Sequence, residues 1–155
     1  MNQRRLSRVL ILAGALAVAG VAFMLYAVPV YLFMLGRGAM YSITHMALGI
    51  PYMAALWQYF RICKNIGDDR SFTPENARRL DVIAKLLFLA TALWAAMLLL
   101  ILLSSGGAVA GYALISCVEI GLTLMATLAV GLVAKMMALL VGRASRLQEE
   151  NDLTI

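Results

Sequence analysis

The chain has 155 residues, of which 63% are hydrophobic and only 14% are charged. Soluble domains average about 45–50% apolar and about 25% charged residues, so a globule of this length cannot hide the apolar excess. The composition excludes an intrinsically disordered, collagen-like, disulfide-stapled or soluble enzymatic protein. It predicts a small integral membrane protein that is surrounded by the lipid bilayer.

Four apolar stretches are long enough to cross a bilayer as helices, which takes roughly 20 residues each. Leu, Ala and Met dominate these stretches, and the two-residue alternation of a β-barrel strand is absent from them. We therefore predict an all-α fold, an integral membrane four-helix bundle in which residues 1–155 form a single transmembrane domain. The predicted spans are residues 9–35, 39–61, 84–103 and 108–136, with a loop at 62–83 and a tail at 143–155.

The basic residues predict the orientation of these spans, because Lys and Arg in short loops stay in the cytoplasm. With both termini in the cytoplasm, every one of the 13 Lys and Arg residues except Arg37 lies on the cytoplasmic side. This collar of basic residues is attracted to anionic lipid headgroups. The net charge of +5 therefore needs no direct binding of nucleic acid.

The predicted loop contains a pattern that is typical of a helix start. Thr73 suits the N-cap, Pro74 suits the first helical position, and Glu75 suits the positive end of the helix dipole. We predict a helix that starts at this point and continues into the third span. Its polar face would carry Arg78 and Arg79 along the membrane surface.

The C-terminal tail turns acidic after its last arginine, with Glu149, Glu150 and Asp152. One hypothesis is that this tail docks against Arg78 and Arg79, which lie on the same side of the membrane. The alternative, given equal weight, is a solvated and frayed end, because exposed ion pairs contribute only about 0–1 kcal/mol. These five residues form the predicted partner-contacting set.

Two phrases of the sequence indicate a family. Residues 72–80 read FTPENARRL, and the C-terminus reads EENDLTI. With these phrases and this order of spans, the chain resembles over its whole length a bacterial family of uncharacterised four-span inner-membrane proteins, catalogued as a domain of unknown function. The resemblance implies a multi-pass protein of the bacterial inner membrane. It also implies a cytoplasmic helix-turn-helix regulator as a candidate partner, because such genes often lie beside one, and it implies no catalytic residue.

Glu119 is the one acidic residue inside a predicted span, where a charge costs about 2.5–3.5 kcal/mol on insertion. Helical spacing places Ser116, Thr123 and Thr127 on the same face, and such a polar stripe must face protein or water. His45 lies roughly 9 Å below the outer surface and Glu119 roughly 16 Å below it, by the helical rise per residue. We predict either a ligand or ion site formed by Glu119, His45, Ser116 and Thr123, or a hydrogen-bonded carboxyl that joins helices.

Small residues on the first and fourth spans would let neighbouring helices approach closely. On the first span these residues are Ala13, Ala17 and Gly20, and Gly131 is an example on the fourth span. They serve packing within the chain or between copies of it. A homo-oligomer therefore stays an alternative to a single packed chain.

The sequence contains no motif for catalysis, phosphate binding or metal binding, so we expect no enzyme, no cofactor and no metal site. Our first interpretation is a regulatory or interaction protein that contacts a partner through its cytoplasmic loop and tail. The alternative is a small transporter, or a resistance or immunity factor, that uses a polar intramembrane site at Glu119. Loss of function after changes at Arg78 and Arg79 would favour the first interpretation, and loss after Glu119→Gln would favour the second.

Overall fold

The computed structural model describes residues 3–34, 46–68, 71–104 and 111–152. The elements within these ranges are all helices: α1 (Gln3–Met34), α3 (Ile50–Gly67), α4 (Pro74–Ser104) and α5 (Gly111–Asp152). The all-α fold that the apolar pattern predicts is therefore confirmed.

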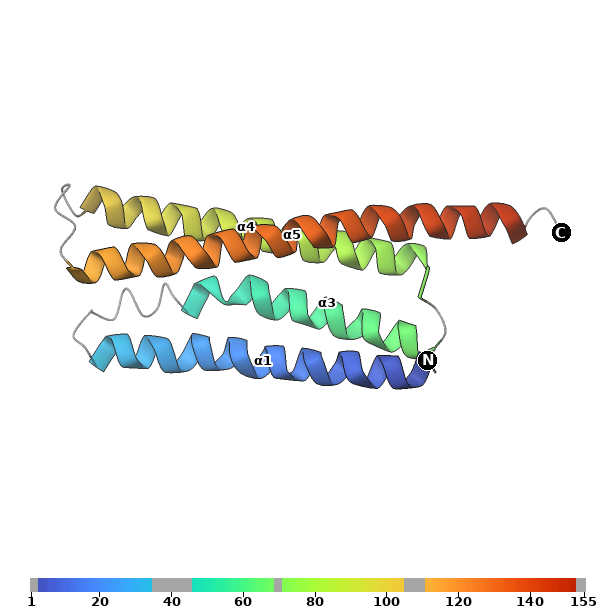
Figure 1. Cartoon of the computed structure of the whole chain (residues 1–155), viewed down its shortest axis with the longest axis horizontal. Coiled ribbons are helices and arrows are strands. Elements are labelled where there is room, and N and C mark those ends of the chain that lie inside the picture. Colours follow the sequence, from blue (N-terminus) through green and yellow to red (C-terminus); the bar gives the residue numbers. More distant parts are fainter. Residues whose placement is uncertain (1–2, 35–45, 69–70, 105–110, 153–155) are drawn as a thin grey trace.

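The four helices lie along the long axis of the molecule and pack in chain order (Figure 1). α1 packs against α3, α3 packs against α4, and α4 and α5 share the most extensive contact. The start of α1, the connection between α3 and α4, and the C-terminal end of α5 lie at one end of the bundle (Figure 1). We call it the basic end, because this end and the helical turns next to it hold Arg5, Arg8, Arg61, Lys64, Arg78, Arg79, Lys85, Lys135, Arg143 and Arg146.

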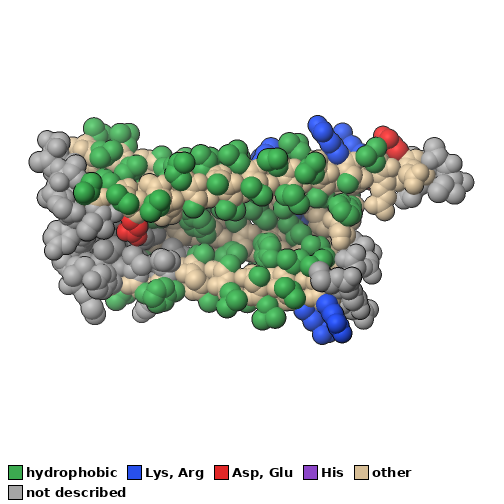
Figure 2. Space-filling model, viewed as in Figure 1, with side chains coloured by type: hydrophobic (Ala, Val, Ile, Leu, Met, Phe, Trp, Pro, Cys, Tyr) green, Lys and Arg blue, Asp and Glu red, His purple; other side chains and the backbone are tan. Residues whose placement is uncertain are grey.

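Apolar side chains cover much of the visible face of the bundle (Figure 2). Large apolar side chains are exposed on all four helices, whereas soluble monomers rarely expose large continuous apolar surfaces. Among the described residues, α1, α4 and α5 are each long and apolar enough to cross a membrane. The chain is therefore a membrane protein.

The helices differ from the predicted spans mainly at their ends. α1 begins at Gln3 rather than at residue 9, and α4 begins at Pro74, so the helix extends well before residue 84. α5 continues past residue 136 to Asp152, and the part of the predicted tail up to that residue is helical rather than frayed.

The second predicted span, residues 39–61, is covered only in part, because residues 39–45 lie outside the described residues. α3 covers its second half and continues to Gly67, into the predicted loop. α3 is not among the helices that are long and apolar enough to cross a membrane by themselves. Its second half carries the polar residues Gln58, Arg61 and Lys64, which lower its hydropathy.

The helix start predicted at Thr73 is confirmed. The backbone N–H of Asn76 donates to Thr73 Oγ1 at 3.2 Å, and the backbone N–H of Ala77 donates to the Thr73 carbonyl at 3.1 Å. Pro74 occupies the first helical position, where the missing N–H is not needed. Local sequence therefore determines where α4 begins.

The close approach of α1 to α3 depends on Gly14. A Cβ atom at this position would lie only 2.7 Å from Cε1 of Tyr59, so the ring packs directly on the glycine. Ala13, Ala17 and Gly20 are exposed, so they do not pack helices within the described part of the chain, and packing between copies of the chain stays a prediction. Apolar residues surround the first span on every side, and they leave no sequence signal for the face that meets α3.

The buried core lies between α3, α4 and α5, beside the helical turn that precedes α3. On α5, a Cβ atom at Gly131 would lie 3.1 Å from Cε1 of Phe88 on α4. Gly131 therefore serves packing within the chain. The core consists of Leu48, Trp94, Met97 and Ile120, with Tyr52, Leu98, Ile101 and Leu124 packed around them.

Candidate functional site

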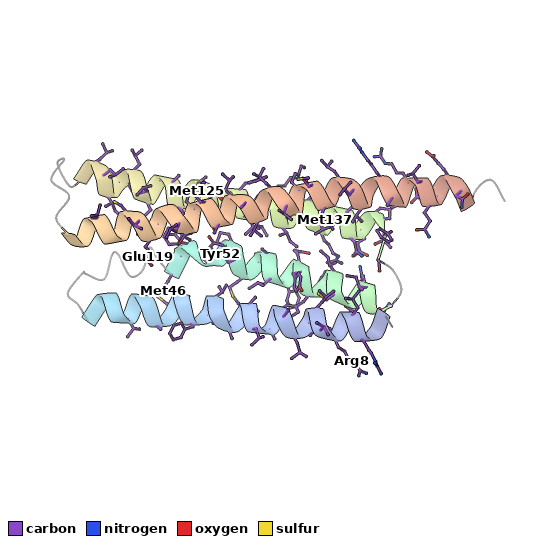
Figure 3. The ribbon with its side chains drawn as sticks, viewed as in Figure 1. Arg8, Met46, Tyr52, Glu119, Met125 and Met137 are labelled. Carbon is purple, nitrogen blue, oxygen red and sulfur yellow. The ribbon has the colours of Figure 1, made fainter. Side chains whose placement is uncertain are left out.

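Glu119 lies in the apolar part of α5, and its side chain is exposed. In the view of Figure 3 it points away from α4, on the side where α3 begins. The Thr123 hydroxyl donates to the backbone carbonyl of Glu119 at 2.9 Å rather than to its carboxylate. Within the described residues, the carboxylate has no hydrogen-bond or ion-pair partner. His45 and the side chain of Ser116 lie outside the described residues, so the predicted four-residue site stays a prediction.

A chain of hydrogen bonds crosses the core and joins α3, α4 and α5. Trp94 Nε1 donates to the Tyr52 hydroxyl at 3.0 Å, and this hydroxyl lies 2.6 Å from Thr127 Oγ1. The Thr127 hydroxyl donates its proton to the Thr123 carbonyl at 2.7 Å, so Tyr52 must donate to Thr127. One prediction from the sequence was that Glu119 joins helices through hydrogen bonds. In the described part of the chain, Thr127 has this role.

Sequence reasoning found only part of this chain of hydrogen bonds. Thr127 belongs to the predicted polar stripe, whereas the sequence pattern predicts no hydrogen bond between Tyr52 and Trp94. A tryptophan in an apolar span is itself a signal, because a buried indole N–H needs an acceptor. The identity of that acceptor depends on which helices are neighbours.

Asp81 joins two lysines at the basic end. Lys135 of α5 donates to Asp81 Oδ1, and Lys85 Nζ lies 2.8 Å from Asp81 Oδ2. Hydrogen bonds from Lys135 and then from Lys85 hold the pKa of the Asp81 carboxyl below its ordinary value. This cluster fixes the first turns of α4 against α5, just before the apolar part of α4.

Asn76 anchors the connection between α3 and α4. Its side chain is only 1% exposed, which is unusual for an asparagine. Asn65 Nδ2 donates to Asn76 Oδ1 at 2.7 Å, and Asn76 Nδ2 donates to the Ser71 carbonyl at 3.1 Å. The FTPEN phrase therefore contains a helix cap followed by a buried asparagine that binds the end of the preceding helix.

A cleft of about 270 Å³ opens between α3 and α4 at the basic end. Arg79 forms part of its wall, since Nη1 donates to Gln58 Oε1 at 3.2 Å and Nη2 pairs with Glu75. The Arg79 side chain is only 15% exposed, whereas Arg78 is exposed. The two arginines of the predicted partner-contacting set therefore differ in their accessibility. The cleft is lined by Gln58, Arg61, Glu75, Arg78, Arg79 and Val82.

The acidic residues of the predicted tail lie at the projecting end of α5 (Figure 1). Glu149 and Glu150 are exposed, and Asp152 ends the helix, with a side chain outside the described residues. The ion-pair partner of Arg79 is Glu75 of its own helix. As far as Asp152 the tail is thus a helical extension of α5 rather than a frayed end, and its docking against Arg78 and Arg79 stays a prediction.

A family model described as a protein of unknown function, DUF2975, matches residues 2–155. This match confirms the resemblance to a domain-of-unknown-function family along the whole chain. No curated protein and no solved structure matches the chain. The comparisons therefore bring no reaction, ligand or partner, and any function has to be inferred from the geometry.

Proposed function

The chain belongs to the DUF2975 family of proteins of unknown function, and we propose that it is a regulatory or interaction protein of the bacterial inner membrane. In this proposal its basic end lies in the cytoplasm, and the projecting end of α5 contacts a partner protein. A cytoplasmic helix-turn-helix regulator is the proposed class of partner. The proposal includes no enzymatic reaction.

The distribution of charge supports the proposed orientation. Among the described residues, no Lys or Arg lies in the half of the bundle away from the basic end, and Figure 2 shows no blue side chains there. Basic residues close to the ends of spans are retained in the cytoplasm during insertion. The four described helices run in alternating directions, so the start of α1 and the end of α5 both lie at that end (Figure 1).

The observation that carries the proposed function is the C-terminal end of α5. This helix continues beyond the start of α4 and projects from the bundle (Figure 1). It presents Arg143, Arg146 and Glu149 as exposed charges, and between them Leu147 is 66% exposed. A projecting helix that combines exposed charges with an apolar side chain suits insertion into the groove of another protein.

Photocrosslinking in living cells tests this contact. A photoreactive residue in place of Leu147 should crosslink to a discrete cytoplasmic protein, because its side chain is free to enter a partner. The same residue in place of Leu132 is the matched control, since Leu132 is 52% exposed on the same helix but lies within the apolar part. The products would be identified by mass spectrometry.

The expected result is an adduct with a helix-turn-helix protein from position 147 and only lipid adducts from position 132. Removal of the acidic charges by Glu149→Gln and Glu150→Gln should weaken the adduct from position 147. The proposal is contradicted when position 147 yields no cytoplasmic protein, or when both positions yield the same one.

A transporter, or a resistance or immunity factor, is a second proposed function, favoured by one observation. Glu119 is an exposed carboxylate in an apolar helix and has no partner among the described residues, as expected of a group that binds a proton or cation. In proteoliposomes, Glu119→Gln should abolish proton-coupled flux without unfolding the protein. Glu149→Gln should leave the flux unchanged. Equal flux in the two variants would exclude this function for Glu119.

A further inference from the structure

The cleft between α3 and α4 has an excess of positive charge. Three of its lining side chains are arginines and one is a glutamate, which gives a formal charge of +2 (three minus one). The glutamate, Glu75, pairs with Arg79. Of the residues that the structure describes, none forms an ion pair with Arg61 or Arg78. Two guanidinium groups thus border one concave site without a carboxylate to neutralise them.

Arg79 gives this cleft a preformed wall. Its two terminal nitrogens contact Gln58 and Glu75, and these contacts hold the guanidinium in place. Its Nε atom is buried and has no hydrogen-bond partner in the described part of the chain. A buried donor without an acceptor is costly, so the contacts of the two terminal nitrogens have to outweigh this cost.

The cleft lies at the depth of lipid headgroups. Val82 is its most apolar lining residue, and the apolar part of α4 begins about one helical turn after it, at Leu86. On α3, the Arg61 guanidinium lies 5.4 Å from the ring centroid of Trp57, and this tryptophan is 61% exposed. Exposed tryptophans are typical of the interface between water and hydrocarbon, so the neighbouring arginine lies where phosphates are found.

We propose that this cleft binds a phosphate-bearing anion, the headgroup of an anionic phospholipid, through Arg61 and Arg78 with Arg79 as the fixed wall. Guanidinium groups bind phosphate oxygens in pairs of charge-assisted hydrogen bonds. Basic pockets between membrane helices bind lipid headgroups in this way. The cleft volume of about 270 Å³ suits a headgroup, since sites for whole drug-sized ligands take about 300–1,000 Å³.

A lipid is the occupant that the position favours. The acidic end of α5 extends away from the bundle, and Glu75 is already engaged by Arg79. The hydrocarbon tails of a lipid could lie along the exposed apolar surface of α4, where Leu89 and Leu93 are exposed. The inference goes beyond the proposed function and does not depend on a partner for α5.

Native mass spectrometry of the full chain in uncharged detergent micelles tests the proposal. The wild-type chain should retain one phosphatidylglycerol in preference to phosphatidylcholine. The double variant Arg61→Gln/Arg78→Gln should bind it at least roughly tenfold more weakly, because each charge-assisted hydrogen bond is worth more than one factor of ten. Arg78→Gln alone, at an exposed position, should give an intermediate loss even if the double variant fails to fold.

The matched control is Arg8→Gln/Lys64→Gln, which removes the same charge from exposed positions at the same end but outside the cleft. It should retain the lipid as the wild-type chain does. Equal loss in the two double variants, or no loss from Arg78→Gln, would overturn the site. Competition with inorganic phosphate tests whether the site takes free phosphate instead of a lipid headgroup. If phosphate does not displace the lipid, the lipid site is supported. If phosphate binds and displaces the lipid, the lipid assignment is overturned.

Discussion

The Tyr52 hydroxyl connects three helices, because it accepts from Trp94 of α4 and donates to Thr127 of α5. Tyr52→Phe removes both hydrogen bonds and leaves the indole N–H without its acceptor. We expect a loss of about 1–2 kcal/mol in the free energy of unfolding, toward the upper part of the range for hydrogen bonds in membrane helices. Unfolding in mixed detergent micelles would measure it.

Thr127→Val provides the partner for a double-mutant cycle with Tyr52→Phe. Because the two hydroxyls share one hydrogen bond, the losses should not add, and the coupling should lie near 0.6–1.7 kcal/mol, about the range measured for such pairs. Additive losses would show that the two hydroxyls act separately. The hydrogen bond between Tyr52 and Thr127 could not be predicted from the sequence, because no local signal places α3 beside α5.

At the scale of the element, the start of α4 could be predicted from the sequence and the surroundings of Glu119 could not. Thr73 and Pro74 act within one helical turn, so their roles follow from local order alone. Burial of Asn76 depends on Asn65 at the end of a different helix. Glu119 depends still more on its neighbours, because helical spacing gives the face of α5 but not the helix that the face meets.

The ends of the helices show the same limit. Apolar composition locates the membrane part of a helix, but a helix continues wherever its backbone bonds and side chains allow, so α3 and α5 run on through polar sequence. Charge at the end of α5 indicated a tail, yet nothing in that segment breaks a helix before Asp152. The burial of the Arg79 side chain could not be predicted from the sequence either, because its hydrogen-bond partner Gln58 lies on another helix.

At the scale of the whole molecule, the contact between α1 and α3 is the least extensive contact between the described helices. Within the described ranges α1 packs only against α3, whereas α3, α4 and α5 share the buried core. The contact depends on Gly14, where any side chain meets the ring of Tyr59. Gly20 lies on the same helix with nothing within 4 Å of its Cβ position. The two glycines thus form a matched pair for testing how α1 is held.

We expect Gly14→Leu to lower the free energy of unfolding by about 1–3 kcal/mol, the usual cost of overpacking, and Gly20→Leu to change it by no more than about 0.5 kcal/mol. Both changes remove a helix glycine, so the gain in helix propensity is common to the two variants and cancels in their difference. Unfolding by a denaturing detergent would measure that difference. Equal effects of the two substitutions would mean that the packing of Gly14 on Tyr59 contributes nothing to the assembly of the bundle.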